Sequence, residues 1–215
     1  MVVNDKKTVM LCMSDAISFQ PEARMMAGND TITSKDQMKV FGFVFGKQPT
    51  VNTHVELLIR RLRSRTWALT KLKRAGFSEA ELVRLYCGAI RPVAEYATPA
   101  FHSMVPGHLA ALLERQQSQA LKHIFGSDMS AAAMRERASI PTLTSRRESA
   151  TIKFAVKASK NPRFAAWFPQ RPGQRRGRRS RPLWEPISRT DRARNSPLNF
   201  MRRKLNDIAE SESPP

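Results

Sequence analysis

Short apolar stretches predict short β-strands in the first 45 residues of the chain. The predicted strands are residues 9–13, 23–27, 31–33 and 39–45. Between the second and third, Gly28-Asn29-Asp30 supplies residues that tolerate positive φ, as a hairpin turn requires. This β element is too small to be stable alone, so we expect it to be attached to a larger fold.

From Thr53 the apolar residues recur with the period of an α-helix. Thr53 and Glu56 form a predicted capping box, and the helix is expected to run to about Arg74 and stop at Gly76. Its inward-facing residues are Val55, Leu58, Ile59, Leu62 and Leu69. A second capping box, Ser78 with Glu81, opens a helix that Pro92 is expected to end.

Three more helices follow from the same pattern. One lies between Pro106-Gly107 and Gly126, a short one covers about Ser130–Ala138, and the last begins at Ser145 with Glu148 and reaches Lys160. The predicted inward face of the first of these consists of Leu109, Leu112, Leu113, Ala120 and Ile124. The fold class is therefore mainly α, with a strand element over residues 1–48 and a helical bundle over 49–168.

Residues 169–215 have a different composition, rich in Arg, Pro and Gly with little to bury. We expect a disordered basic tail, in which a short amphipathic helix over 198–208 either docks or remains loose and the end from Glu210 is frayed. The run Arg175-Arg176-Gly177-Arg178-Arg179 could equally serve as a nuclear localisation signal.

The charge of the chain narrows the class of partner. Lys and Arg number 37 against 18 Asp and Glu, which gives a net charge of +19 and a pI near 11.1. Such an excess favours a polyanion, of which nucleic acid is the first candidate and an anionic membrane the weaker one, since no long apolar run occurs. Cys12 and Cys87 lie in apolar stretches, and no signal peptide is recognisable, which indicates nucleus or cytoplasm and not secretion.

Two helices carry rows of cations that we predict to bind nucleic acid. Steps of three or four place the first row within an arc of about 80° on the helix over 53–74, opposite the leucines. Its members are Arg60, Arg63, Trp67, Lys71 and Arg74. Cations would neutralise phosphates while the indole stacks on a base or sugar. The alternative is that Trp67 packs on the second helix and the charges form a solvated face.

The second row lies on the helix that ends at Lys160. It comprises Arg146, Lys153, Lys157 and Lys160. Together with the arginine run, the two rows favour an electrostatic groove over surface decoration. No catalytic residue, cofactor or metal site is predicted, because the carboxylates are scattered and the four histidines have no ligand spacing.

Six short segments occur in a recognisable order along the chain. They are Asn4-Asp5-Lys6-Lys7-Thr8, Phe41-Gly42-Phe43-Val44, Ile90-Arg91-Pro92-Val93-Ala94-Glu95-Tyr96-Ala97, Leu113-Glu114-Arg115-Gln116-Gln117, Leu143-Thr144-Ser145-Arg146-Arg147, and Arg189-Thr190-Asp191-Arg192 with Asn195-Ser196-Pro197. In this order they resemble the carboxy-terminal portion of the reverse transcriptases of non-LTR (LINE-type, jockey-like) retrotransposons. His54 also lies where that family has a helix-opening histidine. Phe41 replaces the usual leucine, and Phe101 stands where tryptophan is usual.

The resemblance implies that residues 1–48 are the end of a polymerase palm and that residues 49–168 are a thumb or connection region that grips template and primer. The fingers, the Tyr-x-Asp-Asp aspartates and any endonuclease would precede Met1, so this chain alone is expected to be inactive, with magnesium needed only by the whole polymerase. Lys7 matches a lysine thought to assist the leaving group, although a simple turn lysine is the alternative. The expected partners are RNA or an RNA–DNA hybrid, and the missing part of the polymerase. A non-catalytic helical interaction protein and a relic without host function remain alternatives.

Overall fold

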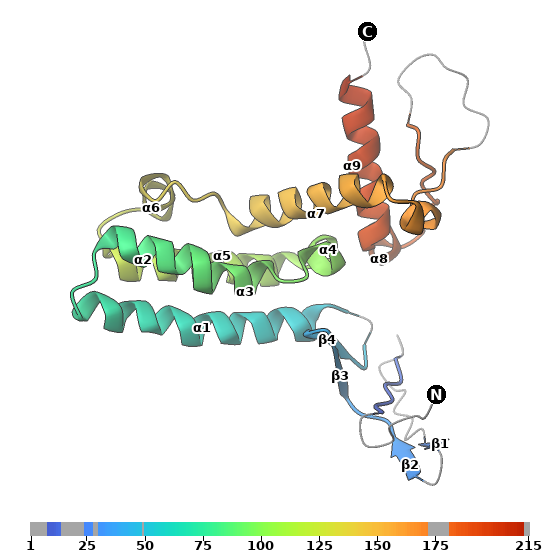
Figure 1. Ribbon diagram of the computed structural model, residues 1–215, viewed down its shortest axis with the longest axis horizontal. Coiled ribbons are helices and arrows are strands. Elements are labelled where there is room, and N and C mark those ends of the chain that lie inside the picture. Colours follow the sequence, from blue (N-terminus) through green and yellow to red (C-terminus); the bar gives the residue numbers. More distant parts are fainter. Residues whose placement is uncertain (1–7, 14–23, 28–29, 49, 172–180, 213–215) are drawn as a thin grey trace. The chain divides into compact units, whose positions relative to one another are not determined.

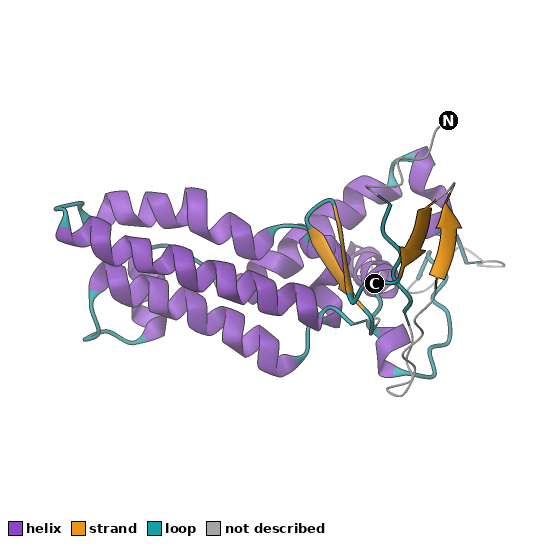
Figure 2. Ribbon diagram, turned by 90° about the horizontal axis from the view of Figure 1, so that it is seen from below, coloured by secondary structure: helices purple, strands orange, loops and turns teal. Residues whose placement is uncertain are grey.

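A computed structural model describes residues 8–13, 24–27, 30–48, 50–171 and 181–212 of the chain. The chain divides into an N-terminal unit, residues 1–60, and a helical unit, residues 61–215. Strands occur only in the N-terminal unit of the described chain, and helices make up most of the remainder (Figure 2). The mainly α prediction is confirmed, but the division falls inside the first helix rather than at residue 48.

The N-terminal unit contains two antiparallel hairpins. Strands β1 (Arg24–Ala27) and β2 (Asp30–Thr33) pair Met25 with Ile32, so the predicted hairpin forms, although Asp30, which was predicted in the turn, belongs to β2. Residues 28–29 lie outside the described residues. Strands β3 (Gln37–Val40) and β4 (Phe43–Gly46) form the second hairpin.

The prediction of one strand over residues 39–45 was wrong, because the chain reverses at Phe41-Gly42. Both residues have positive φ, 47° and 84°, as a two-residue type I′ turn requires. Phe41 is 91% exposed, so the turn keeps a large apolar side chain out of the core. Periodicity alone does not reveal such a turn, since phenylalanine rarely adopts positive φ.

The strand predicted over residues 9–13 does not form. Met10 makes a single parallel bridge to Ser34, supported by a hydrogen bond of 2.9 Å from the Lys35 N–H to the Met10 carbonyl oxygen. One bridge is not a strand, because a strand needs a neighbour along its length.

Helix α1 (Asn52–Arg74) follows the predicted pattern closely. All five predicted inward residues are buried, and Gly76 follows the end of the helix with φ of 92°. The helix begins one residue before Thr53, so Thr53 lies inside it and is not the N-cap. Near this end the imidazole of His54 accepts a hydrogen bond of 3.3 Å from the β4 residue Val44 and stacks on Phe43, with ring centroids 4.1 Å apart.

The second predicted helix is confirmed at its start and wrong at its end. After α2 (Glu79–Leu85) the chain widens into the π-helix η2 (Tyr86–Ile90) and continues as α3 (Arg91–Glu95). Pro92 therefore lies in the first turn of α3, where its missing N–H and fixed φ cost little. A π segment is one of the few ways to carry a helical path across a proline.

The Ser78–Glu81 capping box has a testable pH dependence. Ser78 donates hydrogen bonds to the Glu81 carboxylate, 2.6 Å from its hydroxyl and 2.9 Å from its N–H, and these lower the Glu81 pKa below its ordinary value of 4.5. A lowered carboxyl pKa stabilises the fold above pH 4.5 and stops doing so as the pH falls through the folded-state value. We expect the stability difference between wild type and Glu81→Gln to shrink in acid, as urea unfolding at several pH values would show; a constant difference would contradict this.

Five elements complete the centre of the helical unit. The short helices α4 (Thr98–Phe101) and η3 (His102–Met104) lead into α5 (Gly107–Phe125), α6 (Ala131–Arg137) and α7 (Leu143–Ser159). On α5 four of the five predicted inward residues are buried, and Leu112 is half-buried. Helix α7 begins two residues before Ser145, and Thr142 caps it by accepting a hydrogen bond of 3.2 Å from the Ser145 N–H, so the predicted Ser145 cap was wrong.

The predicted disordered tail is wrong for residues 181–212. After the 3₁₀-helix η4 (Pro162–Trp167) come α8 (Asp191–Arg194) and α9 (Pro197–Glu212), which is longer at both ends than the helix predicted over 198–208. This segment docks because it does bury apolar groups. The shared cluster consists of Ala155 and Ala158 of α7 with Phe168, Leu183 and Met201.

Within the helical unit the helices form layers (Figure 1). Helices α2, α3 and α5 lie between α7 and the end of α1 from Arg61 to Arg74, and α9 crosses α7. Helix α7 contacts α3, α4, α5 and α9. Each outer helix therefore presents its own exposed face.

Candidate nucleic-acid interface

The cationic row on α1 is exposed along its whole length. The side chains of Arg60, Arg63, Lys71 and Arg74 are all exposed, and they make no ion pair with a described residue. Trp67 is 59% exposed, and the Lys71 ammonium lies 4.0 Å from the centroid of its ring. The exposure of Trp67 disfavours the alternative interpretation that its ring packs against the second helix, while the exposure of the cations fits both a binding row and a solvated face.

Other polar residues of α1 have structural partners and fix the row in place. Arg65 donates a hydrogen bond of 2.9 Å to the Ala89 carbonyl oxygen of η2. Lys73 donates one of 2.7 Å to the Ile124 carbonyl oxygen near the end of α5, where helix carbonyls lack partners. Thr70 and His123 are joined by a hydrogen bond of 2.9 Å. The helix thus separates structural cations on one side from unpaired cations on the other.

The predicted row on α7 is only partly free. Lys153, Lys157 and Lys160 are exposed and make no ion pair within the described chain. Arg146 instead pairs through two nitrogens with the Glu95 carboxylate, and this hydrogen bonding raises the pKa of the guanidinium above its ordinary value. Arg146 is therefore less available to a phosphate than the three lysines, although it shares the Glu95 carboxylate with Arg91. Its part in a phosphate-binding row stays a prediction.

The two rows do not line one groove. Figure 1 shows α2, α3 and α5 between α1 and α7, so the cations of the two helices are on different layers of the unit. The α1 row combines an exposed aromatic ring with flanking cations. The exposed cations of the α7 row are three lysines, and the predicted row contains no aromatic residue. The α1 row is therefore the better candidate surface.

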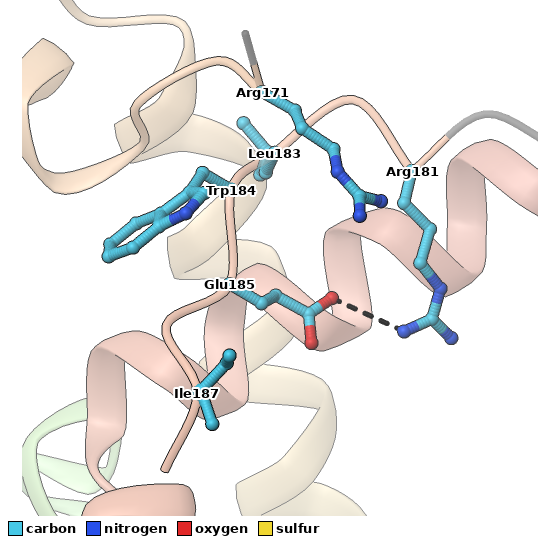
Figure 3. Close-up of a pocket in the computed structure, with 6 residues that line it drawn as sticks. All are labelled: Arg171, Arg181, Leu183, Trp184, Glu185 and Ile187. Atoms are coloured by element: carbon cyan, nitrogen blue, oxygen red, sulfur yellow. Dashed lines mark hydrogen bonds and ion pairs between the residues drawn. The ribbon is translucent and has the colours of Figure 1, made fainter. Parts of the chain in front are cut away.

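The remaining predicted contacts, Lys7 and the arginines Arg175, Arg176, Arg178 and Arg179, lie outside the described residues. The segments that flank the arginine run form a hollow of about 590 Å³ lined by Arg171, Arg181, Trp184 and neighbouring residues (Figure 3). Arg181 is paired with Glu185, Asp207 and Glu210 at 3.4, 3.5 and 3.0 Å, and the hydrogen bond that it donates to Glu210 raises the Arg181 pKa. Because three carboxylates pair with Arg181, the charge of this guanidinium is already satisfied within the described chain.

Three of the six segments that carry the family resemblance, residues 90–97, 113–117 and 143–147, are joined by hydrogen bonds, which sequence reasoning did not foresee. Glu114 of α5 accepts hydrogen bonds at the start of α7 from the Leu143 N–H (3.2 Å), the Thr144 N–H (2.6 Å) and the Thr144 hydroxyl (2.8 Å). Gln117 accepts another from the Leu143 N–H at 3.2 Å and donates one to the Pro141 carbonyl oxygen at 3.0 Å. These residues set the position of α7 and are not placed for chemistry.

Of the two arginines in the Leu143–Arg147 segment, Arg147 is buried in the bundle and Arg146 is half-buried. Arg146 reaches Glu95 in the Ile90–Ala97 segment, and Arg147 is 1% exposed with one hydrogen bond of 3.2 Å to the Thr144 hydroxyl. Burial lowers the pKa of Arg147, partly offset by Glu114 and Glu95. In the sequence, only the order of the motifs indicated that these residues are structurally related.

The described residues offer no group of three or more His, Cys, Asp and Glu side chains that could hold a metal ion. Among the helices of the described ranges, none is long and apolar enough to span a membrane. No protein-family model, curated protein or solved structure matches this chain. Its function is therefore inferred from its own residues and their geometry.

Proposed function

We propose that this chain is a fragment of a retrotransposon RNA-directed DNA polymerase that retains a template–primer binding surface and lacks the catalytic aspartates. The observation that carries the proposal is the exposed α1 row, in which Arg63, Lys71 and Arg74 make no ion pair with a described residue and accompany the 59% exposed ring of Trp67. Its partner is RNA or an RNA–DNA hybrid in the nucleus or cytoplasm. Magnesium would be needed only by a whole polymerase.

The α1 row has the chemistry that a nucleic-acid backbone requires. Unpaired Lys and Arg release condensed counterions when they contact phosphates, which drives binding. The Lys71 ammonium lies 4.0 Å from the centroid of the Trp67 ring, so a cation for a phosphate and a ring face for a base or sugar lie side by side. A surface of this kind grips backbone and ring faces without reading sequence.

The contacts among the segments that carry the resemblance are a second observation that supports the proposal. Glu95, Glu114 and Arg146 join three segments of the resemblance into one packing unit. These residues pack the helices against one another. This packing role explains why the segments occur together in a chain that has no Tyr-x-Asp-Asp sequence. The resemblance then concerns a helical scaffold beyond the catalytic centre.

The test compares three fluorescent ligands over a salt series from about 0.05 to 0.5 M, since affinity for a polyanion falls linearly with the logarithm of salt. We expect tighter binding to an RNA–DNA hybrid than to single-stranded RNA or heparin. Trp67→Ala should weaken hybrid binding by about fivefold or more, the loss of one stacking contact. Trp184→Ala removes another exposed indole, 44% exposed, and serves as the control. Equal, salt-erased binding to all three ligands would refute the proposal.

A further inference from the structure

An apolar groove lies at the junction of α4, α7, η4 and α9, away from the α1 row. Its volume is about 550 Å³, and its main lining residues are Pro99, Ala100, Phe154, Trp167, Leu198 and Met201. Phe154 and Trp167 leave 36% and 38% of their surfaces exposed, so two aromatic side chains face the opening. This size falls within the range of sites that receive several apolar groups.

The groove is held open by its surroundings. Met201 is 3% exposed and belongs to the core cluster shared by α7 and α9. The Trp167 carbonyl oxygen accepts a hydrogen bond of 2.8 Å from the Arg202 guanidinium, and the Trp167 ring lies 4.6 Å from that of Phe164. A partner therefore meets a preformed surface and does not have to order it.

The lining excludes a nucleobase as the natural occupant. Every named lining side chain is apolar, so the donors and acceptors of a base would lose water without gaining partners. Apolar side chains of a peptide have no such groups and fit without that loss. The groove thus differs in chemistry from the α1 row.

Charge decides what kind of peptide fits. On α7, Lys157 lies about one turn after Phe154, and Lys153 directly precedes Phe154 in the sequence. Neither lysine makes an ion pair with another described residue. A second copy of the chain would bring another +19 charges to this surface and be repelled. We propose that the groove is a docking site for an acidic amphipathic helix whose apolar residues, spaced three or four apart, enter the groove while its carboxylates face Lys153 and Lys157.

The experiment uses the full chain and a fluorescein-labelled peptide with leucines at i, i+3 and i+7 and glutamates on the other face. A scrambled peptide of the same composition and a peptide with lysine in place of glutamate are the comparisons. We expect only the amphipathic acidic peptide to bind. Ala100→Trp, which fills the groove, should weaken binding about tenfold or more, as loss of a central contact does.

Matched variants separate groove binding from general attraction. Lys153→Glu with Lys157→Glu should weaken binding, whereas Arg115→Glu with Lys122→Glu, the same charge change at exposed sites on α5, should not. The lysine variants decide the matter if Ala100→Trp fails to fold, which circular dichroism would reveal. Equal affinity for the scrambled peptide, or displacement of the peptide by single-stranded RNA together with loss of RNA binding in Trp167→Ala, would overturn the proposal.

Discussion

Reversal of three cations on α1, Arg63→Glu, Lys71→Glu and Arg74→Glu, is expected to lower the affinity for an RNA–DNA hybrid by about a hundredfold or more near 0.1 M salt. Each cation that contacts a phosphate contributes ~0.9 to the slope of log affinity against log salt, so the slope should fall with the affinity. The helix itself should persist, because all three side chains are exposed and make no ion pair with described residues. Fluorescence anisotropy across a salt series measures both quantities.

The control for this variant carries the same change in net charge at other exposed sites. Arg84→Glu, Arg115→Glu and Lys122→Glu alter α2 and α5, whose cations are not part of the α1 row. We expect this control to lose far less affinity than the α1 variant, since long-range attraction is screened within about 10 Å at 0.1 M salt. Equal losses in the two variants would mean that net charge, and not the α1 row, accounts for binding.

Glu114→Ala is expected to destabilise the helical unit by about 2 kcal/mol. The carboxylate accepts three hydrogen bonds from Leu143 and Thr144, two of them from N–H groups in the first turn of α7, which lack partners inside the helix. Loss of an N-terminal cap costs ~0.5–2 kcal/mol, and loss of a hydrogen bond to a charged group costs ~1.5–3 kcal/mol. Water reaches this partly exposed site and replaces part of the lost hydrogen bonding, so the expected loss is smaller than the sum of the two. Equilibrium urea unfolding followed by circular dichroism measures the change.

The comparison for Glu114 is Glu136, an exposed carboxylate on α6 without a hydrogen-bond partner of its side chain among the described residues. Glu136→Ala should change the free energy of unfolding by less than about 0.5 kcal/mol, as is usual for an exposed site. Glu114→Gln should fall between the two, because the amide still accepts hydrogen bonds but has no charge to interact with the helix dipole. Equal stability of Glu114→Ala and Glu136→Ala would show that the contact does not stabilise the fold.

Local sequence patterns determined where most helices lie. The apolar period of α1, the Ser78–Glu81 capping box and the Gly126 end of α5 were all recognisable, because helix formation depends on residues three or four apart. The exposure of the α1 row was predictable for the same reason, since a cation opposite a buried stripe has to face solvent.

Contacts between distant residues decided what the sequence alone could not. The ion pair between Arg146 and Glu95 joins residues that are 51 positions apart in the sequence. The hydrogen bond from Arg202 to the Trp167 carbonyl oxygen, which anchors the docked tail, joins residues 35 positions apart. The tail was predicted to be disordered because its few apolar residues stabilise it only when they are buried against α7. Sequence thus determined the helices and their polar faces, while tertiary packing decided which cations remain free, because an ion pair or a buried contact depends on partners that local periodicity does not specify.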